Sequence, residues 1–197
     1  MGSDTFLDAV ARIDAAHADD PARVTVNGRA MARELHYADC MSAWLLRLRP
    51  DAPEALRLAV RAQHLRRWEV PRASYPEGRA GYHKWRTDLM RKHAALAGEL
   101  LTAAGYGEEV VARTRSLIEK RALRSDPDAQ ALEDAACLVF LELDYAEFVA
   151  KHDDDDKILG ILRKTWSKMS DAARSLATTV PLVGRGAELL ARALEGE

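Results

Sequence analysis

Cysteine, proline and glycine are all scarce in this sequence. Its 197 residues include 2 cysteines, 7 prolines and 11 glycines. Cys40 and Cys137 lack the spacing of a zinc knuckle or a redox pair, so we expect two reduced, buried thiols. Runs of β-branched residues are also few, whereas alanine, leucine and arginine dominate. A chain of this length can bury a sizeable core. These features predict one all-α domain over residues 1–197.

Signals for membranes and for several enzyme classes are missing as well. No signal peptide opens the chain, and no apolar run is long enough to cross a bilayer. We therefore expect a cytoplasmic protein that does not bind membranes. The sequence has no glycine-rich phosphate loop, no nucleophile elbow and no zinc-protease motif.

The net charge of −2 conceals an uneven distribution. Residues 61–124 contain 14 lysines and arginines against 7 aspartates and glutamates, whereas the following segment is acidic and leads to four consecutive aspartates at 153–156. A basic middle third can attract phosphates or nucleic acid. It can also be the solvated surface of several helices, so the charge alone leaves both interpretations open.

The most apolar stretch is LEDAACLVFLEL, residues 132–143, which carries Glu133 and Asp134 near its start. Ser125 or Asp126 can cap a helix here. A helix that is apolar on nearly every side is a buried one. Two carboxylates in a buried helix need partners, because desolvation penalises a lone charge heavily. Arginines, backbone donors or a metal held with histidines could each supply them.

Three histidines occur at nearly equal steps on three successive predicted helices. His36, His64 and His93 are separated by 28 and 29 residues. Neutral imidazoles and carboxylates are the ligands of zinc, iron and manganese, and a helical bundle can bring them together from facing helices. The pattern predicts a divalent metal ion (Zn, Mn or Fe) bound by His64, His93 and Asp134, with His36 as a further ligand.

Each of these residues also has a structural interpretation. His36 can be an ordinary helix residue, and His93 can be a core histidine with satisfied hydrogen bonds. His64 is the strongest functional candidate, because glutamine and arginine residues surround it in the sequence. Glu133 and Asp134 can instead form structural ion pairs with arginines.

The longest segment predicted to be irregular, residues 69–81, holds two prolines and two glycines. Long loops in compact domains are often functional. Arginine's planar fork suits phosphate, and aromatic rings can stack bases. Arginines packed over core aromatic rings are the structural alternative. The candidate phosphate- or substrate-binding residues in and around this segment are Arg67, Arg72, Arg79, Tyr82 and Arg86.

The order of the histidines and the late aspartate resembles the HD-domain superfamily of metal-dependent phosphohydrolases, which are all-α bundles. In this resemblance His36 stands for the first histidine and His64 for the histidine of the His-Asp dyad. His93 stands for a later histidine, and Asp134 for the closing aspartate. The residue after His64 is Leu65 rather than aspartate, so the dyad is broken in this chain.

Four longer strings resemble a second family, the domain of unknown function 4202 family. They are RAQHLRRWEVPR, YPEGRAGYHKWRT, LEDAACLVFLE and KHDDDDKILGILRKTWSKMS. This resemblance extends over most of the chain. It implies a shared fold and carries no implication about a reaction or a cofactor.

Together these features predict a bundle of about eight helices, HD-domain-like, that acts as a metal-dependent phosphohydrolase on a nucleotide or another phosphorylated small molecule. The metal would lower the pKa of bound water and polarise the phosphoryl oxygen. Glu133 and Asp134 are the predicted catalytic residues. The alternative is a non-catalytic module that binds RNA or a nucleotide at a degenerate HD-type site. A third interpretation is a scaffold whose polar core is only structural.

Overall fold

The computed structural model describes residues 4–121 and 125–195, and most of them are helical. The first half of the chain forms α1 (Asp4–Ala18), β1 (Arg23–Val26), β2 (Arg29–Ala32), α2 (Arg33–Leu48), α3 (Glu54–Arg61), the 3₁₀ turns η1 (Arg67–Glu69) and η2 (Arg72–Ser74), α4 (Gly78–Ala103) and α5 (Glu108–Ile118). The second half forms α6 (Pro127–Val139), the π-helical turn η3 (Phe140–Asp144), α7 (Tyr145–Ala150), α8 (Asp155–Trp166), α9 (Asp171–Ala177) and α10 (Gly184–Leu194). The all-α prediction is confirmed.

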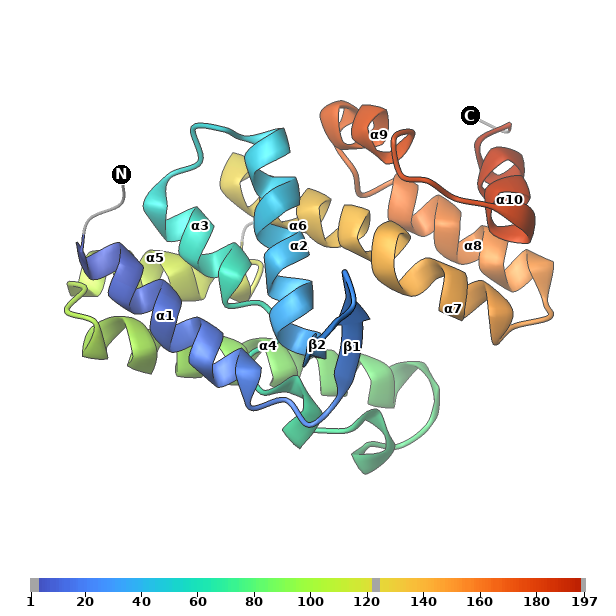
Figure 1. Ribbon diagram of the computed structural model, residues 1–197. Helices are drawn as coiled ribbons and strands as arrows, with labels where there is room; N and C mark the ends of the chain where they lie inside the picture. Colours follow the sequence, from blue (N-terminus) through green and yellow to red (C-terminus); the bar gives the residue numbers. More distant parts are fainter. Residues whose placement is uncertain (1–3, 122–124, 196–197) are drawn as a thin grey trace.

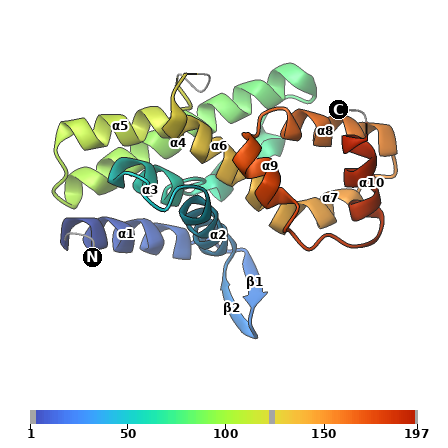
Figure 2. The same cartoon turned by 90° about the horizontal axis from the view of Figure 1, so that it is seen from above.

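The helices divide into two groups that α6 connects. Helices α1, α3, α4 and α5 lie together on one side, and α7, α8, α9 and α10 lie on the other (Figures 1 and 2). Helix α2 crosses α6 between them. No helix in the described ranges is both long and apolar enough to span a membrane.

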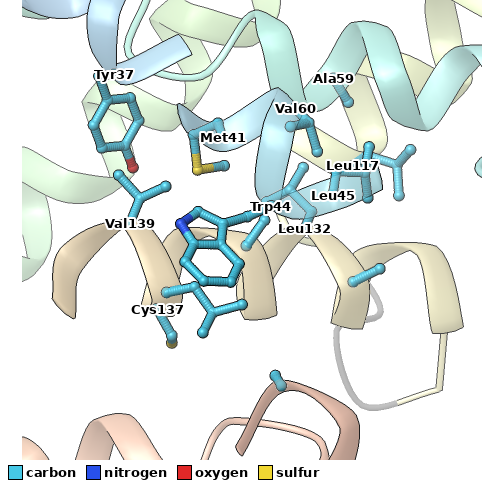
Figure 3. Close-up of a cluster of buried hydrophobic side chains, with 14 of the residues drawn as sticks. Tyr37, Met41, Trp44, Leu45, Ala59, Val60, Leu117, Leu132, Cys137 and Val139 are labelled. Carbon is cyan, nitrogen blue, oxygen red and sulfur yellow. The ribbon is translucent and has the colours of Figure 1, made fainter. Parts of the chain in front are cut away.

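Helix α2 packs on α6 through an apolar stripe at helical spacing. Tyr37, Met41, Trp44 and Leu45 are at most 9% exposed, because residues three, four and seven positions apart share one face of a helix. Figure 3 shows the side chains of Tyr37, Met41 and Trp44 directed toward α6. Leu132, on the facing side of α6, is fully buried. This contact forms the centre of the hydrophobic core.

Helix α6 begins where its sequence predicts. The Asp126 side chain accepts hydrogen bonds from the backbone N–H groups of Asp128 and Ala129, and Pro127 occupies the first turn. The apolar periodicity predicts one uninterrupted helix over residues 127–151, whereas the structure contains one departure from it, the π-helical turn η3. Within this turn Glu142 accepts a hydrogen bond of 2.6 Å from the Trp44 indole N–H, which ties the turn to α2.

The hairpin before α2 was only half predicted. Its turn residues Asn27 and Gly28 both have positive φ values, 50° and 76°, as a two-residue hairpin turn of type I′ requires. The sequence predicts one short extended piece and a turn over residues 24–28, whereas the structure adds a second strand, Arg29–Ala32, that pairs with the first. This second strand is rich in alanine, which has little strand propensity. Figure 2 shows the hairpin projecting away from the helices.

The periodicity of apolar residues predicts a helix from Pro53 to about Trp68, which is longer than the observed helix. Helix α3 ends at Arg61, and the chain then turns with His64 and Arg66 in the left-handed region, at φ 63° and 50°. Residues other than glycine adopt this conformation rarely, so helical periodicity could not show the break. The break changes the direction of the His64 side chain, which therefore does not belong to a helix face.

Candidate functional site

Five polar side chains meet between α2, α4 and the turn after α3. We call Glu34, Tyr37, His64, Arg67 and His93 the central cluster. The His64 ring is stacked on the Tyr37 ring, with centroids 4.2 Å apart and planes 21° from parallel. The His93 ring centroid lies 5.9 Å from that of His64. The structure thus brings together two of the predicted histidines, His64 and His93.

Local sequence places each member of the cluster. On α2, Glu34 and Tyr37 are three residues apart and start the stripe that continues through Met41. On α4, His93 lies four residues after the buried Leu89, on the same face. The left-handed turn directs His64 back toward both helices. Such a backbone conformation costs about 1–3 kcal/mol, so packing must hold it in place.

Arg67 Nη1 lies near both ring nitrogens of His64, 3.4 Å from Nδ1 and closer to Nε2. The His64 Nε2 lies 2.9 Å from Nη1 of Arg67, which can only donate, so we assign the His64 proton to Nδ1. Nδ1 lies 3.3 Å from Oε2 of Glu34. That contact is within ion-pair distance, but it is not aligned as a hydrogen bond, because Glu34 Oε2 accepts none from the described residues.

Three buried polar atoms at or beside the cluster have no hydrogen-bond partner in residues 4–121 and 125–195. They are Glu34 Oε2, His93 Nε2 and His17 Nδ1. His17, at the end of α1, uses its other nitrogen to reach the Arg61 carbonyl at 3.0 Å. Because more than nine-tenths of buried polar groups in proteins are hydrogen-bonded, unpartnered atoms this close together indicate a site for a ligand or for water.

Burial keeps both imidazoles of the cluster neutral. Burial lowers the pKa of His64 well below its usual range, and the nearby charges of Arg67 and Lys120 lower it further. Burial also lowers the pKa of His93, to about 2, with His64 and Arg67 acting in the same direction. Burial raises the pKa of the Glu34 carboxyl, and the Arg67 charge opposes that rise. The cluster therefore combines neutral imidazoles with an arginine.

Glu133 lies beside the cluster and is paired with lysines rather than arginines. Lys120, at the end of α5, forms an ion pair with it, and the Lys168 ammonium lies 3.5 Å from Glu133 Oε1. Burial raises the pKa of Glu133, but these two lysines outweigh burial and the net shift is downward. The Arg86 charge acts on both Glu133 and His64. Glu133 is therefore an ionised carboxylate at the margin of the cluster.

Asp134 accepts hydrogen bonds at the start of α9 rather than from the histidines. Its Oδ1 accepts hydrogen bonds from Gln130 Nε2 and from the Ser170 backbone N–H, both at 2.9 Å, and its Oδ2 accepts one of 2.6 Å from the Ser170 hydroxyl. Ser170 is the residue that caps α9. Successive helix residues differ in direction by about 100°, so Glu133 and Asp134 face different neighbours. The predicted ligand set of His64, His93 and Asp134 does not converge.

His36 also stands apart from the cluster. It is half-buried on α2, outside the stripe that carries Glu34 and Tyr37, and both of its ring nitrogens lie 3.9 Å from the Cys40 sulfur. Across residues 4–121 and 125–195, no three histidine, cysteine, aspartate or glutamate side chains are arranged to hold a metal ion.

Of the five predicted phosphate- or substrate-binding residues, Arg67 and Arg86 act at the central cluster, and the other three do not belong to it. Arg67 belongs to the cluster, its guanidinium 5.1 Å from the Trp85 ring centroid, and the Arg86 charge reaches His64. Arg72 donates to the Tyr75 carbonyl at 3.0 Å and so stabilises its own loop. The other two, Arg79 and Tyr82, are exposed on α4.

Sequence reasoning missed three residues of the site: Glu34, Tyr37 and Lys120. A signal for the first two was present, because they precede Met41 at the spacing of a buried helix face. Lys120 gave no such signal, since it follows the end of α5 in a left-handed conformation with φ 55°.

One comparison with known proteins identifies the family of this chain. A search of the curated proteins and a search of the solved structures each found no match. Residues 7–190 match the family described as "Domain of unknown function (DUF4202)". The match covers nearly the whole chain and confirms the resemblance of the four sequence strings. The protein belongs to the domain of unknown function 4202 family.

Proposed function

We propose that the central cluster binds the phosphate group of a nucleotide or another phosphorylated small molecule. The proposal rests on the surroundings of the Arg67 guanidinium. The guanidinium is half-buried, donates to a neutral His64, and forms no ion pair with a carboxylate in the described ranges. A guanidinium in this setting matches the planar, bidentate geometry of a phosphate.

Two other half-buried arginines, Arg61 and Arg113, are instead paired with carboxylates. Arg61 forms ion pairs with Asp14 at 2.6 Å and with Asp39 at 2.7 Å. Arg113 pairs with Asp126 at 2.5 Å and with a second aspartate at 2.7 Å. Arg67 differs from both, because its hydrogen-bond partner is uncharged. An anionic ligand would supply a counter-charge in direct contact with Arg67, which the more distant Glu34 carboxyl does not.

Metal-dependent phosphohydrolysis, the activity that a likeness to the HD-domain superfamily would imply, is a second candidate. The observation in its favour is that His93 Nε2 and Glu34 Oε2 are ligand-type atoms without hydrogen-bond partners in the described residues, and that both residues lie near His64. Leu65, in place of the dyad aspartate, is fully buried, and a carboxylate at that position would face the core. Phosphate binding without a catalytic metal is therefore the function that the geometry supports better.

The test is calorimetric titration of the protein with adenosine 5′-monophosphate, in low and high salt and with or without a chelator. Binding should weaken as salt screens the arginines and should not depend on the chelator. Elemental analysis of the wild type, of His64→Ala and of Asp134→Ala accompanies it. Near-stoichiometric zinc, manganese or iron that both variants lose would favour the hydrolase instead. The absence of binding would overturn the proposal.

A further inference from the structure

Glu34 sets a chemical requirement on any ligand of the central cluster. Its side chain is 13% exposed, and Oε2 accepts no hydrogen bond from the described residues. The adjacent Arg33 is directed elsewhere, toward Asp144 Oδ1 at 2.9 Å. Glu34 thus presents an acceptor that receives no hydrogen bond from the described residues, and the charge of Arg67, the arginine that we propose to hold phosphate, acts on it.

A phosphate group cannot satisfy that acceptor. A phosphate dianion presents acceptor oxygens only, and its charge repels a carboxylate. The part of the ligand that meets Glu34 must carry a hydrogen-bond donor, either a hydroxyl or an amine. The positive charges of Arg67 and Arg33 act on Glu34 and would repel an ammonium group, so a hydroxyl fits better.

His93 supplies the second contact. Its side chain is almost fully buried, at 3% exposure, and its Nε2 has no partner in the described part of the chain. A hydroxyl both donates and accepts, so neighbouring hydroxyls can meet a carboxylate oxygen and an imidazole nitrogen at the same time. The two unpartnered atoms belong to residues that both lie next to His64, Glu34 at 3.3 Å from its Nδ1 and His93 with its ring centroid 5.9 Å away.

We infer that the ligand is a phosphate ester of a hydroxylated sugar, such as a sugar phosphate or a ribonucleotide, whose hydroxyl donates to Glu34. This inference rests on the proposed phosphate site at Arg67. It makes Glu34 a residue that determines ligand specificity. It also predicts that phosphates without a sugar hydroxyl group bind more weakly than those that carry one. Inorganic phosphate should therefore be a poor ligand.

The experiment compares four probes by calorimetry: adenosine 5′-monophosphate, its 2′,3′-dideoxy analogue, ribose 5-phosphate and inorganic phosphate. The wild type should bind the ribonucleotide at least about tenfold more tightly than the dideoxy analogue, because hydrogen bonds to charged groups are strong. Glu34→Ala should abolish that difference and leave inorganic phosphate binding unchanged. Glu109→Ala, an exposed position on α5, should retain the wild-type pattern.

Each contrary outcome has a distinct meaning. Equal affinity of the wild type for the ribonucleotide and its dideoxy analogue overturns the inference and leaves the phosphate site standing. Weaker inorganic phosphate binding by Glu34→Ala also overturns it, because a protonated Glu34 would then donate to the phosphate itself. Failure of every probe to bind overturns both. The ligand comparison uses only wild-type protein, so a poorly folded variant cannot obscure it. Similar affinities for ribose 5-phosphate and the ribonucleotide would indicate a site for the sugar phosphate alone. A clearly higher affinity for the ribonucleotide would indicate a site that also binds the base.

Discussion

The imidazole of His64 lies flat against the phenol ring of Tyr37, with 4.2 Å between the ring centroids. This contact joins the buried face of α2 to a strained turn that follows α3 and is not itself helical. It also holds the His64 ring so that Nε2 lies 2.9 Å from Arg67 Nη1 and Nδ1 lies 3.3 Å from Glu34 Oε2. The geometry of the proposed phosphate site therefore depends on this stacked pair.

Replacing Arg67 should remove most of the phosphate affinity. We expect Arg67→Ala to weaken binding of adenosine 5′-monophosphate by about 10- to 100-fold, since a hydrogen bond to a charged group contributes about 1.5–3 kcal/mol. Arg79→Ala is the matched control, because Arg79 is exposed and contacts His83; it should bind as the wild type does. Equal losses in both variants, measured by calorimetry, would place the site elsewhere.

Asp134→Ala should destabilise the fold. The substitution leaves three donors, two of them on Ser170, without their buried acceptor, and we expect a loss of about 2–4 kcal/mol in the free energy of unfolding. Urea denaturation measures it. Asp171→Ala is the control in the same region, because the Asp171 side chain is fully exposed and its loss should have little effect. A stable Asp134→Ala protein that loses a bound metal would restore Asp134 as a ligand.

Lys120→Met tests the ion pair beside the cluster. The Lys120 and Glu133 side chains are only 14% and 7% exposed, so removing the lysine leaves a buried carboxylate that Lys168 only partly neutralises. Breaking a buried pair in this way typically costs about 3–5 kcal/mol. Replacing both partners, as Lys120→Met with Glu133→Leu, should recover most of the stability. A loss below about 1 kcal/mol for the single variant would be typical of a surface pair.

Stability should fall between pH 7 and pH 5 because of His93. Its pKa in the folded protein is about 2, whereas the unfolded chain binds a proton below about pH 6.5. The unfolded state therefore binds more protons as the pH falls, which lowers the free energy of unfolding by about 2 kcal/mol at pH 5. The lowered pKa of Glu133 acts in the same direction only below about pH 4.5. His93→Gln should show a smaller drop in urea denaturation, and an identical drop would contradict this account.

The sequence predicts the fold well wherever a residue has one dominant influence on the local backbone, such as starting a helix. Asp126 and Pro127 begin α6 as expected, and the helices predicted around 172–178 and 184–194 are close to α9 and α10. The left-handed turn at His64 could not be predicted, because histidine adopts this backbone conformation only occasionally, although more often than most residues do; in the structure its ring packs against Tyr37.

The candidate site was predicted in part for similar reasons. The sequence predicts His64, His93 and Arg67 as site residues, because they are polar residues in unusual contexts. The structure brings these three side chains together. Asp134 was assigned to the wrong neighbour, because periodicity shows that a helix is buried without showing which partner each face meets. Ser170, which binds Asp134, is 36 residues away in the chain, a distance over which sequence patterns give no pairing.

The most direct test of the phosphate site follows the histidines themselves. The chain has six, and their imidazole signals in nuclear magnetic resonance spectra can be assigned by single substitutions. On titration with adenosine 5′-monophosphate, we predict saturable shifts of the His64 and His93 signals, while those of the exposed His83 and of His152, near the end of α7, stay in place. Shifts confined to His83 or His152, or no shift at all, would contradict phosphate binding at the central cluster.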